Sequence, residues 1–340
     1  MPAPVLSVKN LTVEFSIQSG TVPVIEDLSF DLEAGKTLSL VGESGCGKSM
    51  TALAIMGLIP SPPGHIASGS IILAGEDLVQ ASDSRLREIR GNEISMVFQE
   101  PMTSLNPVYT IGEQIGETLR RHQGLTRQQA RKEAIKLLDA VRIPLAKQRV
   151  KDYPHQLSGG MRQRVMIAIA LACQPKILLA DEPTTALDVT VQAEIFDLMQ
   201  ELRKEKETAI ILITHDMGSV AEMAERVIVM YAGKIIETGT STEIYHNPKH
   251  PYTIGLLKSV PRLDEKIGTK LDPIEGLPPD LIDVPKGCSF AARCKYSIEK
   301  CLTDSPTLKP VLNGHDSACW RADEITEIAG PMAQPMEHQT

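Results

Sequence analysis

The sequence predicts an α/β fold in which a phosphate-binding loop lies between a strand and a helix of a parallel sheet. An apolar strand at 37–41 runs into a glycine-rich turn and then a helical segment at 49–58, the order of elements that phosphate sites use. Strand patterns at 177–180 and 209–214 flank a helical pattern, which is the alternation of a parallel α/β sheet. Residues 111–150 show helical periodicity without a strand pattern, which indicates an inserted helical subdomain.

The first two strands are expected to pair in an antiparallel sheet. Leu6 to Phe15 and Val24 to Leu32 alternate apolar and polar residues, and Gln18-Ser19-Gly20 between them is a turn sequence. Further strands are expected at Ser70 to Leu73 and at Ile94 to Phe98. The sequence therefore adds an antiparallel β subdomain to the predicted core.

The glycine-rich turn fits the phosphate-loop pattern G-x-x-x-x-G-K-[ST]. Its residues are Gly42, Glu43, Ser44, Gly45, Cys46, Gly47, Lys48 and Ser49. Glycines let backbone N–H groups surround phosphates, and the helix N-terminus adds positive potential. Lys48 is expected to reach the β and γ phosphates and the Ser49 hydroxyl to bind Mg²⁺. A chance glycine turn is the alternative, but its place between a strand and a helix favours an ATP site.

Two later strands end in residues suited to nucleotide chemistry. The strand at 177–180 is followed by Asp181 and Glu182. Beside a phosphate loop, Asp181 is expected to orient Mg²⁺ and Glu182 to polarise the attacking water. The strand at 209–214 is followed by His215, which is expected to contact the γ phosphate. The alternatives are a solvated strand end for the carboxylates and a structural role for the histidine.

The composition is that of an ordinary globular protein and excludes several other classes. Hydrophobic residues make up 42% of the 340 residues and charged residues 23%. A net charge of -8 argues against broad binding to nucleic acid or anionic lipid. The apolar run Val165 to Cys173 is shorter than the roughly 20 residues that span a bilayer. Because the first residues also lack a signal-peptide pattern, we expect a chain that stays in the cytosol.

Four cysteines gather near the end of the chain, in a tail that prolines from 248 onward mark as an appendage beyond the sheet. They are Cys288, Cys294, Cys301 and Cys319. Structural disulfides are not expected in the cytosol, so the thiols predict a metal centre that staples the tail. Their spacing matches neither C-x-x-C zinc sites nor the tight ferredoxin run. Zinc, an iron-sulfur cluster and unligated thiols remain open.

A further segment resembles the signature motif of ATP-binding cassette (ABC) proteins: Leu157, Ser158, Gly159, Gly160 and Met161. Met161 stands where the commonest form has Gln, a difference outside the Ser-Gly-Gly part. The resemblance covers about residues 5 to 240. It implies a P-loop NTPase cassette at 1–240, with a RecA-like core, an antiparallel β subdomain and a helical subdomain at about 100–165. The C-terminal extension at 241–340 then forms a separate small metal-binding unit.

In that family two cassettes pack head to tail, and each ATP lies between one subunit's P-loop and the other's signature helix. The resemblance therefore implies that residues 158–160 complete the site of a partner chain through N–H groups at a helix start. Gln99 resembles the Q-loop glutamine that links Mg²⁺ and water to the permease interface. Asp188, in Ala186-Leu187-Asp188, resembles the D-loop, and His215 the switch histidine. Phe15 sits where the family places an aromatic that stacks on adenine, with core packing as the alternative.

The residues after 240 narrow the resemblance to one group of importers. The segments 247–253 and 275–279, together with the cysteines, are similar to the extension of dipeptide and oligopeptide importer ATPases. Nickel and glutathione importers share that extension and are the alternative. The segment 101–107 also resembles this group and is expected near the permease. Some members carry a [4Fe-4S] cluster here, so the resemblance favours that cofactor for the four cysteines.

The resemblance implies a peripheral ATPase on the cytoplasmic side of the cell inner membrane, with ATP and Mg²⁺ as its cofactors. Hydrolysis at a head-to-tail dimer interface is expected to drive uptake of di- and oligopeptides. The implied partners are a paralogous ABC ATPase, two permease subunits and an extracytoplasmic substrate-binding protein. A soluble ABC ATPase of DNA repair or translation is the rival, but one cassette without a long coiled coil argues against it. A redox sensor built on the cysteines is a second rival.

Overall fold

The computed structural model describes residues 3–100, 104–184, 187–259 and 273–329. Two motifs of the sequence analysis lie partly outside this range. They are residues 101–103 of the segment 101–107, and Ala186 of the D-loop.

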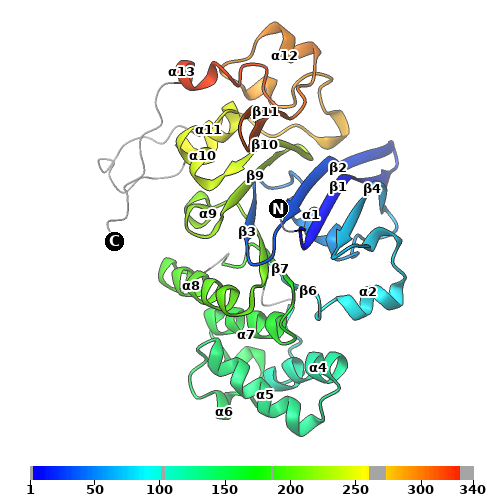
Figure 1. Ribbon diagram of the computed structural model, residues 1–340, viewed down its shortest axis with the longest axis vertical. Helices are drawn as coiled ribbons and strands as arrows, with labels where there is room; N and C mark the ends of the chain where they lie inside the picture. Colours follow the sequence, from blue (N-terminus) through cyan, green and yellow to red (C-terminus); the bar gives the residue numbers. More distant parts are fainter. Residues whose placement is uncertain (1–2, 101–103, 185–186, 260–272, 330–340) are drawn as a thin grey trace.

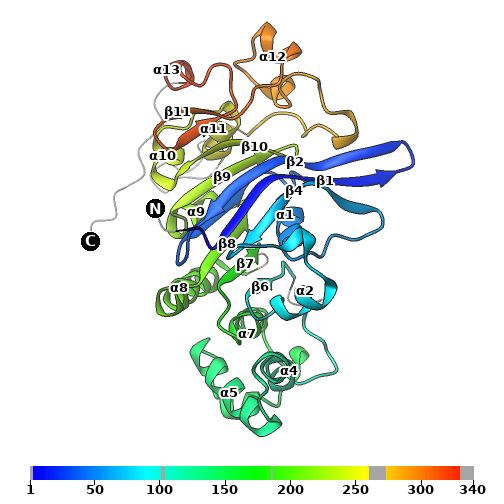
Figure 2. The same cartoon turned by 45° about the vertical axis from the view of Figure 1, so that its right-hand side comes forward.

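An antiparallel sheet opens the chain, as the alternating pattern predicts, with the strand order β2-β1-β4-β5. Its strands are β1 (Leu6–Ile17), β2 (Gly20–Leu32), β4 (Gly64–Leu73) and β5 (Glu76–Asp77). Leu6, Leu11 and Val13 of β1 are fully buried. Figure 2 shows this sheet beside α1 (Lys48–Ile55), the helix that follows the phosphate loop.

The second sheet is the mixed sheet that carries the site, in the order β11-β12-β10-β9-β3-β8-β7-β6. The strands from β9 to β6 run parallel, as predicted, and the remaining pairs are antiparallel. The parallel strands are β3 (Thr37–Val41), β6 (Ile94–Val97), β7 (Ile177–Asp181), β8 (Ala209–Thr214) and β9 (Arg226–Tyr231). The antiparallel strands are β10 (Lys234–Thr240), β11 (Lys309–Leu312) and β12 (His315–Ser317).

Successive side chains of a strand point to opposite sides of the sheet, and in the parallel strands both sides are covered. Leu178 and Ala180 of β7 pack into a core shared with the helices on one side. Ile177 and Leu179 pack into a second core that includes the antiparallel sheet. The helices near the sheet are α2 (Asp83–Ile89), α7 (Gly159–Leu171), α8 (Val189–Lys206) and α9 (Met217–Met223).

The predicted helical subdomain consists of α4 (Ile111–Gln123), α5 (Arg127–Ala140) and α6 (Ala146–Arg149), and it lies at the lower end of the molecule in Figure 1. Thr110 and Thr126 cap the first two helices by accepting hydrogen bonds from backbone N–H groups. Ala134 and Leu138 of α5 are fully buried, as the helical periodicity predicts. In the described part of the chain, no helix is long and apolar enough to cross a membrane.

The C-terminal extension joins the main sheet, which corrects the prediction of an appendage separate from it. Its helices are α10 (Ser241–His246), α11 (Pro251–Lys258), α12 (Glu299–Thr303) and α13 (Ile325–Ala329). Strand β12 pairs with β10, so that Ser317 lies opposite Glu237. The edge of β10 that would otherwise carry unpaired backbone groups is thus covered by the chain's own extension.

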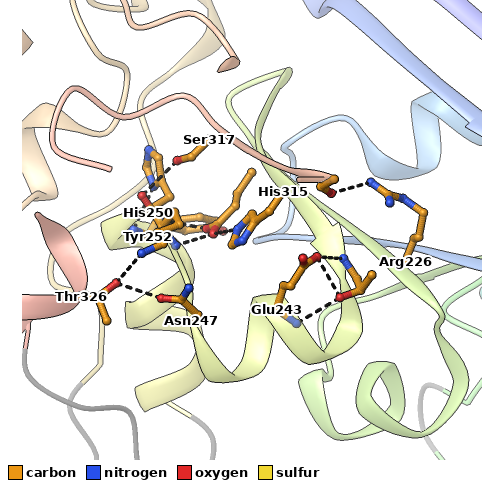
Figure 3. Close-up of polar contacts among 12 residues, drawn as sticks. Arg226, Glu243, Asn247, His250, Tyr252, His315, Ser317 and Thr326 are labelled. Carbon is orange, nitrogen blue, oxygen red and sulfur yellow. Dashed lines mark hydrogen bonds and ion pairs between the residues drawn. The ribbon is translucent and has the colours of Figure 1, made fainter. Parts of the chain in front are cut away.

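One buried carboxylate joins the extension to the sheet. His315 Nε2 lies 2.8 Å from Glu237 Oε1, and both side chains are 0% exposed. The backbone N–H of His250 donates to Glu237 Oε2 at 3.0 Å, and the N–H of Lys249 donates to Oε1. Figure 3 shows the polar contacts around His250 and His315 in this region. Burial lowers the pKa of His250 to about 3, so this ring is neutral and its Nδ1 accepts from Tyr252 N.

We expect Glu237→Ala to lower the free energy of unfolding by about 2–6 kcal/mol, because two buried backbone N–H groups lose their acceptor, at about 1–3 kcal/mol each. The variant leaves two backbone N–H groups and His315 without their acceptor. Denaturant titration followed by circular dichroism measures the change. The exposed Glu222→Ala is the matched control and should unfold at nearly the wild-type midpoint. Equal midpoints for the two variants would contradict a stabilising role for this carboxylate.

Candidate nucleotide site

The phosphate loop between β3 and α1 has a backbone that requires glycine at its two ends. Gly42 has φ 150°, and a Cβ there would lie 2.3 Å from the carbonyl oxygen of Met230. Gly47 has φ 105°, and its Cβ would lie 3.0 Å from the carbonyl oxygen of Val24. A side chain at position 42 would therefore clash with β9, and one at position 47 would be strained by its backbone conformation and crowded against β2.

The start of α1 has the properties of an anion site. Gly47 is its N-cap and supplies no side-chain hydrogen bond, and its first turn contains no acidic residue. Lys48 is 5% exposed, and its Nζ donates to the carbonyl oxygens of Gly42 (2.7 Å) and Glu43 (2.9 Å). A buried ammonium group thus lies under the loop, held by backbone acceptors.

The strand that ends beside this loop brings a carboxylate to Ser49. Asp181 Oδ1 accepts a hydrogen bond from Ser49 Oγ at 3.0 Å. Burial raises the pKa of Asp181 above its usual range, and the hydrogen bond from Ser49 acts in the opposite direction. A hydroxyl and a carboxylate oxygen at this distance form the kind of donor set that Mg²⁺ takes beside substrate phosphates.

The neighbouring carboxylate, Glu182, is held from two sides. Gln99 Nε2 donates to its Oε2 at 2.9 Å, and His215 Nδ1 lies 3.1 Å from its Oε1. Gln99 follows β6 and His215 follows β8, the strands on either side of β7. Glu182 has φ 47°, and its N–H donates to Ile213 O at 2.8 Å. The structure therefore brings together Gln99, Glu182 and His215, which the sequence analysis singled out separately.

The signature residues lie elsewhere in the molecule. Ser158 caps α7 by accepting from Met161 N, and α7 packs against β6, α4 and α5. A Cβ on Gly160 would lie 2.8 Å from Val191, so the glycine lets α7 approach the first turn of α8, which Asp188 caps. Among the described residues, no hydrogen bond joins 157–161 to 42–49. Leu157 is buried in the core on the helical side.

Phe15 lies on β1, opposite Val22 and Gly64. Its ring is half-buried against the core of the antiparallel sheet, and a Cβ on Gly64 would lie 2.8 Å from it. Core packing therefore accounts for one part of the ring. Stacking on adenine stays a proposal.

Two residues that contact the loop were missed by the sequence analysis, and both belong to the extension. The hydroxyl oxygen of Tyr252 accepts from the N–H of Glu43 at 2.7 Å. Arg293 Nη1 and Nη2 donate to the Glu43 carboxylate at 2.6 and 2.9 Å. Tyr252 lies within the segment 247–253, which stood out only as a family resemblance. No periodicity or spacing pattern indicated Arg293.

The four C-terminal cysteines gather as expected, but the described residues do not support the predicted metal centre. Cys288, Cys294, Cys301 and Cys319 line one small cavity together with Phe290 and Trp320. All are free, and no described group of three or more His, Cys, Asp or Glu could hold a metal ion. Burial raises the pKa of Cys294 to about 11 and that of Cys319 to about 12, which favours protonated thiols. The structure therefore does not support the predicted metal-binding extension or its [4Fe-4S] cluster.

The fold and this arrangement of loop, carboxylates, glutamine and histidine define an ATP-binding cassette. Residues 25–185 match the ABC transporter family, and residues 236–301 match the oligopeptide/dipeptide transporter C-terminal region. The chain is 51% identical over 325 residues to the dipeptide transport ATP-binding protein DppD of Bacillus subtilis, covering 96% of this chain and 97% of that protein. It is 52% identical over 321 residues to the oligopeptide transport ATP-binding protein OppD of Haemophilus influenzae, covering 94% and 98%.

The solved structures agree with the sequence relatives. A dimeric ATP-binding cassette in a post-hydrolysis state, bound to ADP and Pi, has a TM-score of 0.63 and 28% identity, covering 69% of this chain and 98% of that one. The chain therefore belongs to the ABC transporter family, among the ATP-binding proteins that carry the oligopeptide/dipeptide transporter C-terminal region.

Proposed function

We propose that the chain is the ATP-hydrolysing subunit of an importer of dipeptides or oligopeptides, with the cassette at 1–240 and the extension at 241–340. One observation carries the ATPase part: Lys48, Asp181 and Glu182 converge on one edge of the sheet. The cargo class rests on relatives that are dipeptide and oligopeptide transport ATP-binding proteins. Those relatives favour peptides over nickel or glutathione.

The loop residues 42–49 would bind the triphosphate. Backbone N–H groups at the start of α1 and the Lys48 ammonium would neutralise the β and γ phosphates. Ser49 and Asp181 would hold Mg²⁺, which when bound draws charge from the phosphate oxygens. Phe15 would stack on the adenine ring at the edge of β1.

Glu182 would act on the attacking water. Its two oxygens have different partners, Gln99 and His215, which fix the orientation of the carboxylate. A carboxylate positioned in this way accepts a proton from water as the water attacks the γ phosphate. Gln99 would link the bound Mg²⁺ and the attacking water to the permease interface. His215 would contact the γ phosphate.

The site would be completed by a second cassette. Ser158, Gly159 and Gly160 begin α7 with N–H groups suited to a γ phosphate, and Asp188 caps the neighbouring helix. The partner would be a paralogous ATPase beneath two permease subunits that an extracytoplasmic binding protein supplies. The chain would lie peripherally on the cytoplasmic side of the cell inner membrane. With a net charge of -8, it is not suited to binding nucleic acid.

We predict that Glu182→Gln retains ATP binding but slows hydrolysis by roughly 10² to 10⁴, the usual contribution of a positioned general base. ATP hydrolysis and uptake of a labelled dipeptide are measured in the reconstituted transporter. The control is Glu201→Gln, an exposed glutamate on α8 that pairs with Arg142 and should leave both rates unchanged. Near-normal turnover in Glu182→Gln would remove Glu182 from this role. ATP turnover by the wild type without peptide uptake would reject the cargo class.

We predict that Ser158→Arg strongly lowers ATP hydrolysis at the site whose P-loop belongs to the partner. This chain's own affinity for ATP should stay nearly unchanged. The arginine would block the start of α7 without touching 42–49. Mixed assemblies, each with one mutant and one wild-type cassette, separate the two sites in single-turnover assays. Loss of ATP binding by the isolated variant would indicate a site built within one chain.

A [4Fe-4S] cluster is a separate proposal, supported by the donor set alone: four thiols around one small cavity. The thiols would need to lose their protons and close around the cluster, which would then staple the extension. We predict roughly four iron and four sulfide per chain after anaerobic purification. Metal analysis of the wild type and of a four-Cys→Ser variant measures this, with Cys173→Ser as the control. Metal-free wild type that is folded and active would reject the proposal.

A further inference from the structure

The extension grips one residue of the phosphate loop at two points. The carboxylate of Glu43 accepts hydrogen bonds from Nη1 and Nη2 of Arg293, at 2.6 and 2.9 Å. Its backbone N–H donates to the hydroxyl oxygen of Tyr252 at 2.7 Å. Glu43 is the acidic residue of the loop 42–49, so both its charge and its backbone direction are set by residues some two hundred positions later.

Arg293 is fixed in place by its other hydrogen bonds. Its Nε donates to Glu275 O at 3.0 Å, Nη1 also to Tyr231 Oη at 3.3 Å, and Nη2 also to Ile274 O at 3.4 Å. The side chain is 5% exposed. All three nitrogens of the guanidinium group are hydrogen-bonded, so its orientation is fixed before it contacts Glu43. Arg293 therefore sets the position of the Glu43 carboxylate. Lysine has a single nitrogen and cannot reproduce this arrangement.

Glu43 also contacts Lys48, the lysine of the loop, through its backbone. Its carbonyl oxygen accepts from Lys48 Nζ at 2.9 Å. Without Arg293 the Glu43 carboxylate would lose its partner, and because Glu43 is only five residues before Lys48 we expect the free carboxylate to compete with phosphate for the ammonium group. In the structure the Arg293 fork holds that carboxylate against the extension.

The position of Arg293 depends on the part of the extension that holds the cysteines. Arg293 ends a short 3-10 turn, Ala291–Arg293, bracketed by Cys288 and Cys294. Ala291 N donates to Cys288 O at 2.9 Å, and Cys294 N donates to Ala291 O at 3.2 Å. A rearrangement around the thiol cavity would therefore move the guanidinium that contacts the loop.

We propose that Arg293 is a positioning residue through which the C-terminal extension sets the affinity of the cassette for MgATP, with Tyr252 as the second contact. The inference rests on the proposed function, because it concerns the same nucleotide site. It assigns the extension a task in the ATPase cycle: it holds Glu43 so that Lys48 is available to phosphate.

The test uses the full chain in its assembled transporter, with steady-state hydrolysis measured against MgATP concentration. Arg293→Ala should raise KM for ATP by about tenfold or more, the change that losing one hydrogen bond to a charged group gives, with kcat nearly unchanged. Adding Glu43→Gln to that variant removes the competing carboxylate and should return KM close to the wild-type value. Tyr252→Phe, which keeps the ring, should raise KM by a smaller factor.

Arg226→Ala is the matched control, because Arg226 also links the cassette to the extension, through Gly314 O at 3.2 Å, without touching the loop. Its KM should equal that of the wild type. Because Glu43→Gln would also relieve destabilisation by an unpaired carboxylate, denaturant midpoints are measured beside KM, and a KM that rises and is rescued while the midpoint stays constant separates positioning from stability. An unchanged KM in both Arg293→Ala and Tyr252→Phe, or no rescue in the double variant, overturns the inference. Wild type that binds no ATP instead rejects the proposed function.

Discussion

The register of the parallel sheet is the constraint on which the nucleotide site depends. Val41 lies opposite Thr214, and Asp181 lies opposite Ile213. The loop after β3, the carboxylates at the end of β7 and the histidine after β8 therefore meet at one edge. A slip of one residue would exchange the side chains that face the two cores, and both cores are apolar and close-packed. Burial of ordinary aliphatic residues thus fixes where the loop, the carboxylates and the histidine lie relative to one another.

The charges at this edge are held by different kinds of partner. Lys48 donates to backbone carbonyls, whereas Asp181 accepts from a hydroxyl and Glu182 contacts a side-chain amide and an imidazole. Backbone carbonyls are weaker partners for an ammonium group than a carboxylate would be. A polyphosphate can therefore compete for Lys48 without first breaking an ion pair to either catalytic candidate.

Local patterns sufficed for the elements whose residues are neighbours in sequence. The strand at Thr37–Val41, the loop and the start of α1 follow from apolar burial and glycine placement. The helix predicted to reach Leu58 ends at Ile55, because Gly57 adopts φ 60°. Pairings across long separations were not predictable in this way. The grip of Arg293 on Glu43 depends on packing between distant segments, for which one sequence carries no periodic signal.

The same limit explains why the extension was expected to lie apart from the sheet. A tail rich in proline and poor in apolar runs gives no sign of the distant strands and side chains that it packs against. In the structure the extension shares a core with the cassette. Phe290 packs edge-on against Tyr231 of β9 and Tyr252 of α11, with ring centroids 5.3 and 5.4 Å apart. The guanidinium of Arg293 lies 5.9 Å from the Tyr231 ring centroid. The contacts that stabilise the extension are therefore continuous with those that reach the phosphate loop, so the extension cannot loosen without altering the loop.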